Sequence, residues 1–220
     1  MTQALKLYDY WRSSAAYRVR IGLNLKGLAY DQAPVNLAPG VDEQFRPAYR
    51  HRNPQSRVPL LETGAGAISQ SLAILEWLDE THPEPPFLPA DPLARAEVRA
   101  FALTIACDIH PLGNLSTLKQ LGQQFAADEA ALQVWRERWF GGGLAVLEER
   151  TAGRPQTTFL FGEAPTLADI CLTPQIYNCR RFHMDLSAFP RLVAATEAAQ
   201  AHPAFAAAAP ELQPDSVKSK

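Results

Sequence analysis

The chain has 220 residues, of which 47% are hydrophobic and 20% charged, with a formal net charge of −2. This composition is that of a soluble globular protein with room for two small domains. With 21 basic and 23 acidic residues and no apolar run of bilayer length, the sequence gives no sign of a concentrated basic face for nucleic acid or of a membrane span, and we expect no secretory signal. We therefore expect neither a nucleic-acid nor a membrane partner.

The cysteines give no sign of a disulfide framework. Cys107, Cys171 and Cys179 are odd in number, and their spacing fits neither paired disulfides nor a zinc site. The five histidines are dispersed, so we expect no metal. Free cysteine packs as a small hydrophobic residue. We expect a reducing, cytoplasmic location.

Residues 1–82 alternate strand-like and helix-like segments. Leu5–Tyr8 is a predicted strand, Ser13–Lys26 a predicted helix and Tyr30–Val35 a second strand. Gly27 stands where a helix C-terminus favours a residue that adopts positive φ. Because a helix connects the two strands, we expect them to pair in parallel.

A hairpin and another helix complete this half. Val58–Glu62 and Ala67–Ile68 are predicted strands joined by a turn at Gly64–Gly66. Ser71 is the expected N-cap of a helix over Leu72–Glu80. The order βαβ, connecting segment, ββα is that of a thioredoxin-like domain.

The proline-dense segment Thr81–Pro86 predicts a domain boundary, and almost everything beyond it is helical. The expected helices are one opened by Pro92 and ended near Pro111, then Leu115–Gln124, Glu129–Arg150, Leu167–Arg181 and Arg191–Ala201. We expect a thioredoxin-like domain over 1–82 and an all-helical bundle over 90–212. The tail from Pro210 has few apolar residues, so we expect it to fray.

A structural signal marks the start of one of these helices. Thr166 stands three residues before Asp169, which is the spacing of a capping box with aspartate in place of the usual glutamate. The apolar residues that follow indicate a buried helix.

Two serines at the start of the first helix could stabilise an anion. Ser13 and Ser14 stand where a helix offers free N–H groups and a partial positive charge. A free thiol of pKa about 8.5 is only about 3% ionised at pH 7, and lowering that pKa by two units takes about 2.7 kcal/mol. A helix terminus with one charge-assisted hydrogen bond supplies that order of energy. The alternative is that both serines are only caps.

Two further segments could hold a peptide thiol. Val58-Pro59 is a candidate cis peptide bond. At that position in a thioredoxin-like domain, the backbone of Val58 could pair with an extended peptide. Gln70 and Ser71 lie at the N-terminus of another helix, which would hold a carboxylate, although taken alone they are more often just a cap.

These segments together match one known pattern. The motif Ser-Ser-Cys-x-Trp-Arg-Val-Arg-Ile-Ala-Leu stands here as residues 13–23, with Ala15 replacing the cysteine and Tyr17 the tryptophan. Further matches are Gln44-Phe45, Asn53-Pro54-Gln55, Val58-Pro59, Gln70–Ile74, Asn114–Gln120, Thr166–Asp169 and Arg181-Phe182. Over nearly its whole length the chain resembles the zeta class of the glutathione transferase superfamily.

That resemblance implies the glutathione transferase architecture and a glutathione site. Ser13 would face the glutathione sulfur, with Ser14 beside it and Arg12 adjacent. The other residues that the resemblance assigns to glutathione are Gln44, Val58, Pro59, Gln70 and Ser71, with Asn114, Leu115 and Ser116 from the helical domain.

The resemblance also implies a function: a cytoplasmic homodimer that isomerises a maleyl diacid, maleylacetoacetate or maleylpyruvate, in aromatic amino-acid or aromatic-compound catabolism. Arginine suits carboxylates because its fork pairs with both oxygens. Arg12 is therefore a candidate anchor, with Arg180 or Arg181 as a second. His110 is either a general acid or a helix-end residue.

Ala15 excludes chemistry that needs a cysteine at that position, such as reductive dehalogenation through a mixed disulfide. Two alternatives to the isomerase stay open. One is a glutathione transferase or lyase acting on another electrophile such as an α-halo acid, and the other is a non-catalytic binding module. The pair Ser13-Ser14 argues against the module, and the arginines favour a diacid. Leu112–Ser116 lacks arginine, and the resemblance to the family then implies a slight preference for maleylacetoacetate.

Overall fold

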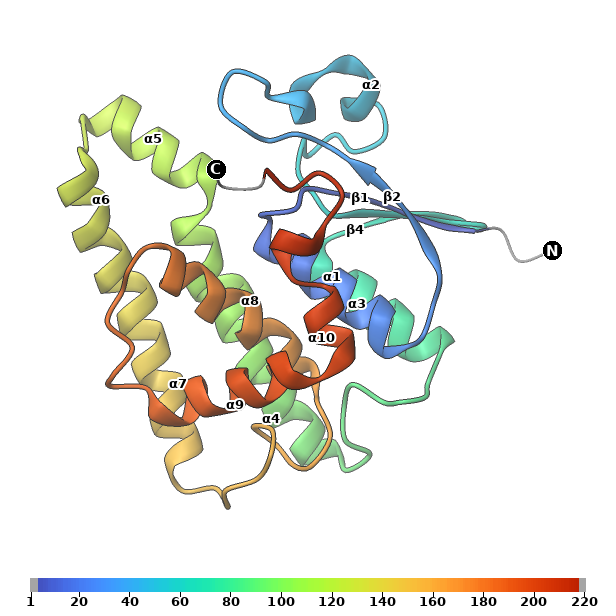
Figure 1. Cartoon of the computed structure of the whole chain (residues 1–220), viewed down its shortest axis with the longest axis vertical. Coiled ribbons are helices and arrows are strands. Elements are labelled where there is room, and N and C mark those ends of the chain that lie inside the picture. The colour runs from blue at the N-terminus through green and yellow to red at the C-terminus, as the bar shows by residue number, and fades with distance from the viewer. Residues whose placement is uncertain (1–3, 218–220) are drawn as a thin grey trace. The chain divides into compact units, whose positions relative to one another are not determined.

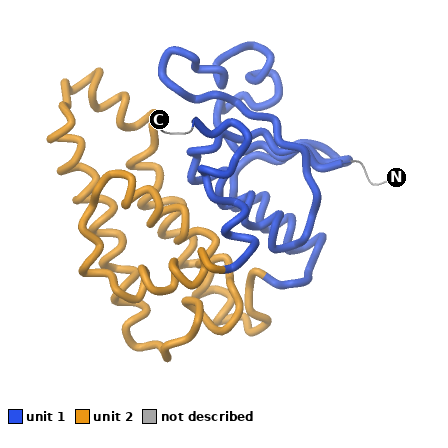
Figure 2. The backbone as a smooth tube through the Cα atoms, in the orientation of Figure 1, with its two compact units in different colours: residues 1–86, 202–220 blue, residues 87–201 orange. Residues whose placement is uncertain are grey.

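The computed structural model describes residues 4–217, which form two compact units. One unit comprises residues up to 86 together with the segment from 202 onward, and the other comprises residues 87–201 (Figure 2). The sequence placed residues 202–212 with the helical domain, whereas here they pack in the first unit.

A four-stranded mixed sheet organises the first unit (Figure 1). Its strands are β1 (Leu5–Asp9), β2 (Tyr30–Pro34), β3 (Leu60–Thr63) and β4 (Gly66–Ser69), in the order β2-β1-β3-β4. β1 pairs in parallel with β2, while β3 is antiparallel to both β1 and β4. The predicted parallel βαβ unit and hairpin are therefore confirmed, and the third strand begins at Leu60 rather than Val58.

The helices of the first unit pack on this sheet or on one another through apolar side chains. They are α1 (Ser14–Leu25), α2 (Pro47–Arg50), α3 (Ser71–Thr81) and α10 (Pro203–Ala207), with 3-10 turns at Glu43–Phe45 and Pro210–Leu212. α1 contacts both α3 and α10, and α1 and α3 lie side by side on the same side of the sheet (Figure 1). The fully buried apolar side chains of this core include Leu7, Val19, Ile21, Leu23, Leu61, Ile74, Leu75, Leu78 and Phe205.

Local chemistry explains where α1 begins and ends. Ser13 is the N-cap, and its hydroxyl accepts a hydrogen bond from the Ala16 N–H at 3.2 Å. Gly27 adopts φ +64° just beyond the last turn, as predicted. The Val58-Pro59 bond is cis, as its position suggested. One expectation is wrong: the N-cap of α3 is Gln70, and Ser71 is the first residue of the helix.

The second unit is helical throughout. Its helices are α4 (Pro92–Leu103), α5 (Leu115–Phe125), α6 (Glu129–Arg136), α7 (Gly142–Ala152), α8 (Leu167–Arg181) and α9 (Pro190–Ala201). π-Helical turns at Thr104–Ile109 and Glu137–Gly141 continue α4 and join α6 to α7. The predicted helix Glu129–Arg150 is thus three consecutive segments. Pro111 lies in a 3-10 turn, His110–Gly113, after the helix has ended.

α8 is the centre of this unit, because nearly every residue from Leu167 to Cys179 is buried. It contacts both α4 and α9. Burial raises the pKa of the Cys179 thiol to about 12, so this group stays protonated at neutral pH. Cys171 is also buried, whereas Cys107 is exposed.

The predicted capping box at the start of α8 is present. One oxygen of the Asp169 carboxylate accepts from the Thr166 N–H at 2.8 Å and from its hydroxyl at 2.9 Å. The other oxygen accepts from the Leu160 N–H at 3.0 Å. Burial raises the pKa of Asp169, and these hydrogen bonds oppose that shift. The carboxylate therefore joins the preceding loop to the helix.

The C-terminal segment does not fray over its described part. It forms a 3-10 turn at Pro210–Leu212, and the side chain of Gln213 is only 6% exposed. Gln213 donates to the carbonyl oxygens of Ala207 at 3.1 Å and Ala209 at 2.8 Å. Polar side chains hold this segment in place where the sequence offers few apolar ones. Residues 218–220 lie outside the described part.

We expect Asp169→Ala to lower the free energy of unfolding by about 3 kcal/mol, because it leaves the buried N–H groups of Leu160 and Thr166 without acceptors. Denaturant unfolding followed by circular dichroism measures this. Asp185→Ala, at an exposed turn, is the control and should leave stability nearly unchanged. Equal stability of the Asp169 variant and the wild type would show that the capping box does not support the fold.

Candidate active site

A tight turn leads from β1 into α1 and presents Ser13. The Ser13 N–H donates to the Tyr10 carbonyl at 2.8 Å, which closes the turn. The Ser13 side chain is half-buried, whereas Ser14 is only 7% exposed. The hydroxyl hydrogen of Ser13 has no acceptor among residues 4–217, so it is available to an anion at the helix N-terminus.

A buried ion pair next to this turn is bonded to it through the backbone of Trp11. Arg20 on α1 donates to the Asp9 carboxylate at 3.0 Å, and both side chains are completely buried. The same guanidinium donates to the Trp11 carbonyl at 3.0 Å and to the Ala208 carbonyl at 3.1 Å. One side chain therefore connects the end of β1, the turn and the C-terminal segment.

The surroundings of the ion pair are strongly desolvated. Burial raises the pKa of Asp9, while the Arg20 charge opposes the shift and the negative charge of Asp215 adds to it. Asp9 Oδ1 has no hydrogen-bond partner among the described residues. A buried carboxylate oxygen without a hydrogen bond costs free energy of folding. The ion pair is therefore stable only while Arg20 keeps its other hydrogen bonds in good geometry.

Arg12 lies at the outer side of the same turn. Its guanidinium stacks over the Trp11 ring at 4.3 Å, and Trp11 is 5% exposed. Arg12 itself is exposed. Stacking on an aromatic ring limits the conformations of the arginine while leaving its N–H groups able to bind a carboxylate.

The N-terminus of α3 is a second anion-binding element in the first unit. Gln70 adopts φ 72°, and no side chain caps the helix, so the first N–H groups lack a side-chain acceptor. The Gln70 amide donates to Gln55 at 2.9 Å. The buried Ser71 hydroxyl accepts from Arg18 of α1 at 3.3 Å, which links the start of α3 to α1.

Gln44 and Val58 are largely buried. The Gln44 amide donates to Asp42 at 3.2 Å, and its Oε1 is a buried acceptor without a partner in the described part of the chain. Val58 is 8% exposed, precedes the cis Pro59, and joins an apolar cluster that includes Tyr8 and Tyr49.

In the second unit, the candidate residues Asn114, Leu115 and Ser116 lie at the start of α5, and His110 lies in the turn before it. Asn114 is the N-cap of α5, and its side-chain oxygen accepts from the Thr117 N–H at 3.0 Å and from the Ser116 hydroxyl at 2.7 Å. Leu115 is 48% exposed. His110 begins the preceding 3-10 turn and is half-buried. Asn114 thus has a structural role as a cap.

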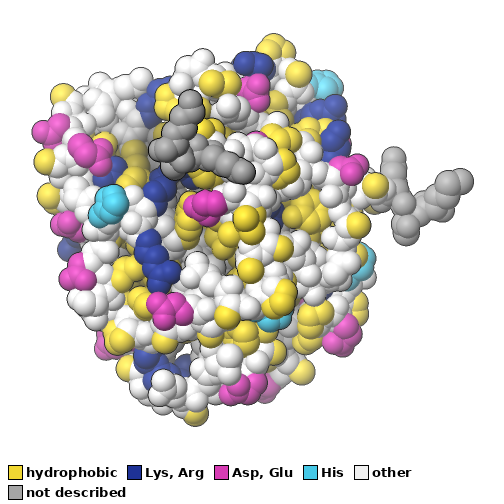
Figure 3. Space-filling model, viewed as in Figure 1, with side chains coloured by type: hydrophobic (Ala, Val, Ile, Leu, Met, Phe, Trp, Pro, Cys, Tyr) yellow, Lys and Arg dark blue, Asp and Glu magenta, His cyan; other side chains and the backbone are white. Residues whose placement is uncertain are grey.

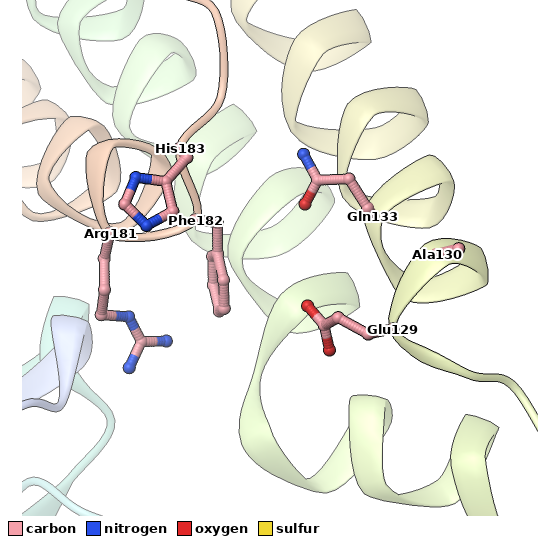
Figure 4. Close-up of a pocket in the computed structure, with 6 residues that line it drawn as sticks. All are labelled: Glu129, Ala130, Gln133, Arg181, Phe182 and His183. Carbon is pink, nitrogen blue, oxygen red and sulfur yellow. The ribbon is translucent and has the colours of Figure 1, made fainter.

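The two adjacent arginines at the end of α8 have different surroundings. Arg180 pairs with Glu197 at 3.3 Å and with Gln200 at 3.2 Å on α9. Arg181 instead lines a cavity of about 430 Å³. In Figure 4, Arg181, Phe182 and His183 lie on one side of this cavity, and Glu129, Ala130 and Gln133 of α6 lie on the other.

Two arginine side chains lie against the Phe182 ring, which lines this cavity. The guanidinium of Arg181 lies 4.3 Å from its centre, and that of the buried Arg136 lies 4.0 Å from it. Arg136 donates to Glu129 at 2.7 Å. The hydrogen bond from Arg136, together with its charge, holds the pKa of the Glu129 carboxyl below its usual range, so the cavity carries charges of both signs.

Sequence reasoning missed the residues that support the site. Asp9 and Arg20 form the buried pair, and Asp215 accepts a hydrogen bond from the Trp11 N–H at 3.0 Å. For Arg20 a signal exists, since two arginines interrupt the apolar run around Val19 and Ile21. For Asp215 none exists, because its partner lies 204 positions away in the sequence.

The described residues contain no group of three potential metal ligands. Within the same part of the chain, no helix has the length and hydropathy needed to cross a bilayer. On the face in Figure 3, acidic and basic side chains are interspersed.

Comparison with known proteins places this geometry in a family. The model of the glutathione S-transferase N-terminal domain matches residues 7–86, and that of the C-terminal domain matches residues 119–207. Maleylacetoacetate isomerase of Pseudomonas aeruginosa is 46% identical over 212 residues, covering 96% of this chain and 98% of that protein.

Solved structures agree with this assignment. A holo maleyl pyruvate isomerase, described as a bacterial zeta-class glutathione S-transferase, matches with a TM-score of 0.93 and 44% identity, over 96% of this chain and 100% of that one. Maleylacetoacetate isomerase from Anaeromyxobacter dehalogenans, solved with bound glutathione, matches with a TM-score of 0.85 and 44% identity, over 96% and 97% of the two chains. The chain therefore belongs to the glutathione transferase family and, within it, to the zeta class.

Proposed function

We propose that this protein is a glutathione-dependent cis–trans isomerase of a maleyl diacid. The observation that carries the proposal is the hydroxyl of Ser13, half-buried at the N-terminus of α1 with its hydrogen available. The relatives named maleylacetoacetate and maleylpyruvate isomerase support the substrate class. The residues around Ser13 suit the binding of a peptide thiol.

Glutathione fits the polar groups that the first unit leaves available. The uncapped N-terminus of α3, with Gln70 and Ser71, suits a carboxylate. Gln44 has a buried acceptor that the described chain leaves unmatched. We assign these residues, together with the backbone of Val58 and Pro59, to glutathione. Asn114, Leu115 and Ser116 are assigned to the same site on the resemblance to the family.

When bound, glutathione supplies a thiolate that adds reversibly to a double bond and so permits rotation from cis to trans. Ser13 donates a hydrogen bond to the anionic sulfur, and the N-terminus of α1 adds a partial positive charge. Ser14, the buried first residue of α1, lies beside Ser13 in the chain. On the resemblance to the family we assign Arg12 and Arg181 to the substrate carboxylates, because guanidinium groups pair with both oxygens of a carboxylate.

The domain roles follow from this assignment. The thioredoxin-like domain provides most of the residues assigned to glutathione, together with Arg12, and the helical domain provides Arg181 for the diacid. On the family resemblance we further propose a cytoplasmic homodimer acting in aromatic-compound catabolism. Between the two named substrates, the lack of arginine in Leu112–Ser116 favours maleylacetoacetate.

The direct test is turnover of maleylacetoacetate and maleylpyruvate, followed by absorbance with and without glutathione. We expect isomerisation that requires glutathione, faster with maleylacetoacetate. Turnover of neither diacid by a protein that binds glutathione would contradict the proposed function. It would favour a transferase or lyase acting on another electrophile.

Ser13→Ala should raise the pKa of the bound thiol and lower kcat/KM about 10- to 100-fold, because a hydrogen bond to a charged group contributes about 1.5–3 kcal/mol. Ultraviolet absorbance of the thiolate across pH measures the pKa. Ser187→Ala, at an exposed turn of the second unit, is the control. An unchanged thiol pKa in the Ser13 variant would show that this hydroxyl does not face the sulfur.

Arg180 and Arg181 form a matched pair for testing the substrate anchor. Arg181→Ala should raise KM for the diacid about tenfold or more, through loss of a charge-assisted contact. Arg180→Ala should change KM less than about twofold, because its exposed ion pair with Glu197 contributes little. Steady-state kinetics with varied diacid at saturating glutathione distinguishes the two, and the reverse order would assign the role to Arg180.

A further inference from the structure

We propose that Asp215 is a positioning residue that holds the turn Tyr10–Ser13, between β1 and α1, in the geometry needed for thiolate stabilisation. No sequence motif points to it, and it contacts neither glutathione nor substrate in the proposed site. Its effect on catalysis depends on the proposed function, whereas its effect on the turn does not.

The turn is held at both peptide groups of Trp11. The Trp11 N–H donates to Asp215 Oδ2 at 3.0 Å, and the Trp11 carbonyl accepts from Arg20 at 3.0 Å. The Ser13 N–H closes the turn on Tyr10 at 2.8 Å. With these bonds in place, the direction of the chain entering Ser13 is determined, and with it the position of the hydroxyl at the start of α1.

The C-terminal segment is itself anchored well enough to position another group. Gln213 is buried and accepts from Gln32 of β2 at 2.8 Å while donating to two backbone carbonyls of its own segment. The Ser216 N–H donates to the Gln213 carbonyl at 3.0 Å. Asp215 lies between Gln213 and Ser216 in the sequence, so the buried Gln213 and the turn closed by Ser216 fix the backbone that carries its carboxylate.

The bond between Asp215 and Trp11 is energetically favourable because its acceptor is a carboxylate and its surroundings are partly dry. Charge-assisted hydrogen bonds are roughly twice as strong as neutral ones. Trp11 is 5% exposed, so its N–H has little access to water once the Asp215 acceptor is removed. Asp215 Oδ1 is buried without a partner among residues 4–217, a cost that the bond through Oδ2 partly offsets. Removal of this carboxylate would leave the Trp11 N–H unsatisfied, and small displacements of a catalytic group have large effects on rate.

The test uses the full-length variants Asp215→Ala and Asp215→Asn, with Asp31→Ala as the control. Asp31 is an exposed aspartate of the same unit. Asparagine keeps an oxygen that can accept from the Trp11 N–H. The first measurement is hydrogen exchange of the peptide spanning residues 8–14, which reports on the turn without reference to activity. The second is the pKa of the glutathione thiol, followed by thiolate absorbance, with kcat/KM.

We expect Asp215→Ala to accelerate exchange at Trp11, to raise the thiol pKa and to lower kcat/KM about five- to tenfold, the effect of one lost hydrogen bond. Asp215→Asn should restore most of each value, and Asp31→Ala should match the wild type.

Unchanged exchange in Asp215→Ala would overturn the proposal. So would a lower melting temperature with unchanged thiol pKa and kcat/KM, because that pattern indicates a purely structural role. A wild-type protein that formed no glutathione thiolate would contradict the proposed function instead, and the exchange data would still decide whether Asp215 holds the turn.

Discussion

The buried ion pair between Arg20 and Asp9 is the interaction on which the candidate site depends. Burying two charges costs several kcal/mol, and the cost is recovered only when good geometry and further hydrogen bonds satisfy the remaining donors. Arg20 meets this condition by donating to Asp9, to the Trp11 carbonyl and to the Ala208 carbonyl. The pair therefore gives orientation more than net stability, since it positions a strand end, a turn and the C-terminal segment relative to one another.

The chemistry of the first unit follows from that support. Two helix N-termini, those of α1 and α3, are linked through the contact of Arg18 with Ser71. Ser13 provides a hydroxyl donor at the first, and the second lacks a side-chain cap. A helix N-terminus that leaves N–H or O–H donors available is suited to an anion, and glutathione carries both a thiolate and carboxylates. The family's use of this fold for a peptide thiol thus has a direct electrostatic basis.

The helical unit depends on α8 in a similar way. Its start is held by Asp169, which accepts hydrogen bonds from Thr166 and from the loop residue Leu160, and its end carries two arginines beside the partial negative charge of the helix C-terminus. Arg180 forms an ion pair with Glu197 of α9, and Arg181 and Phe182 line a cavity with α6. Consecutive residues on a helix point about 100° apart, so adjacent arginines have unrelated surroundings.

The sequence by itself determined the features that local physics controls: the ends of α1, the parallel strand pair and the range of α8. It identified Val58-Pro59 as a candidate cis bond, and the structure decided that this bond is cis. Caps, proline and hydrophobic periodicity act over a few residues, so a pattern is enough. Most site residues came from the family resemblance, because a helix N-terminus with serines is equally well explained as a cap. The tertiary structure alone decided that Ser71 contacts Arg18, that Arg181 rather than Arg180 lines the cavity, and that Asp215 bonds to Trp11. Such contacts depend on side-chain direction and on chain segments far apart in sequence, and no local pattern encodes either.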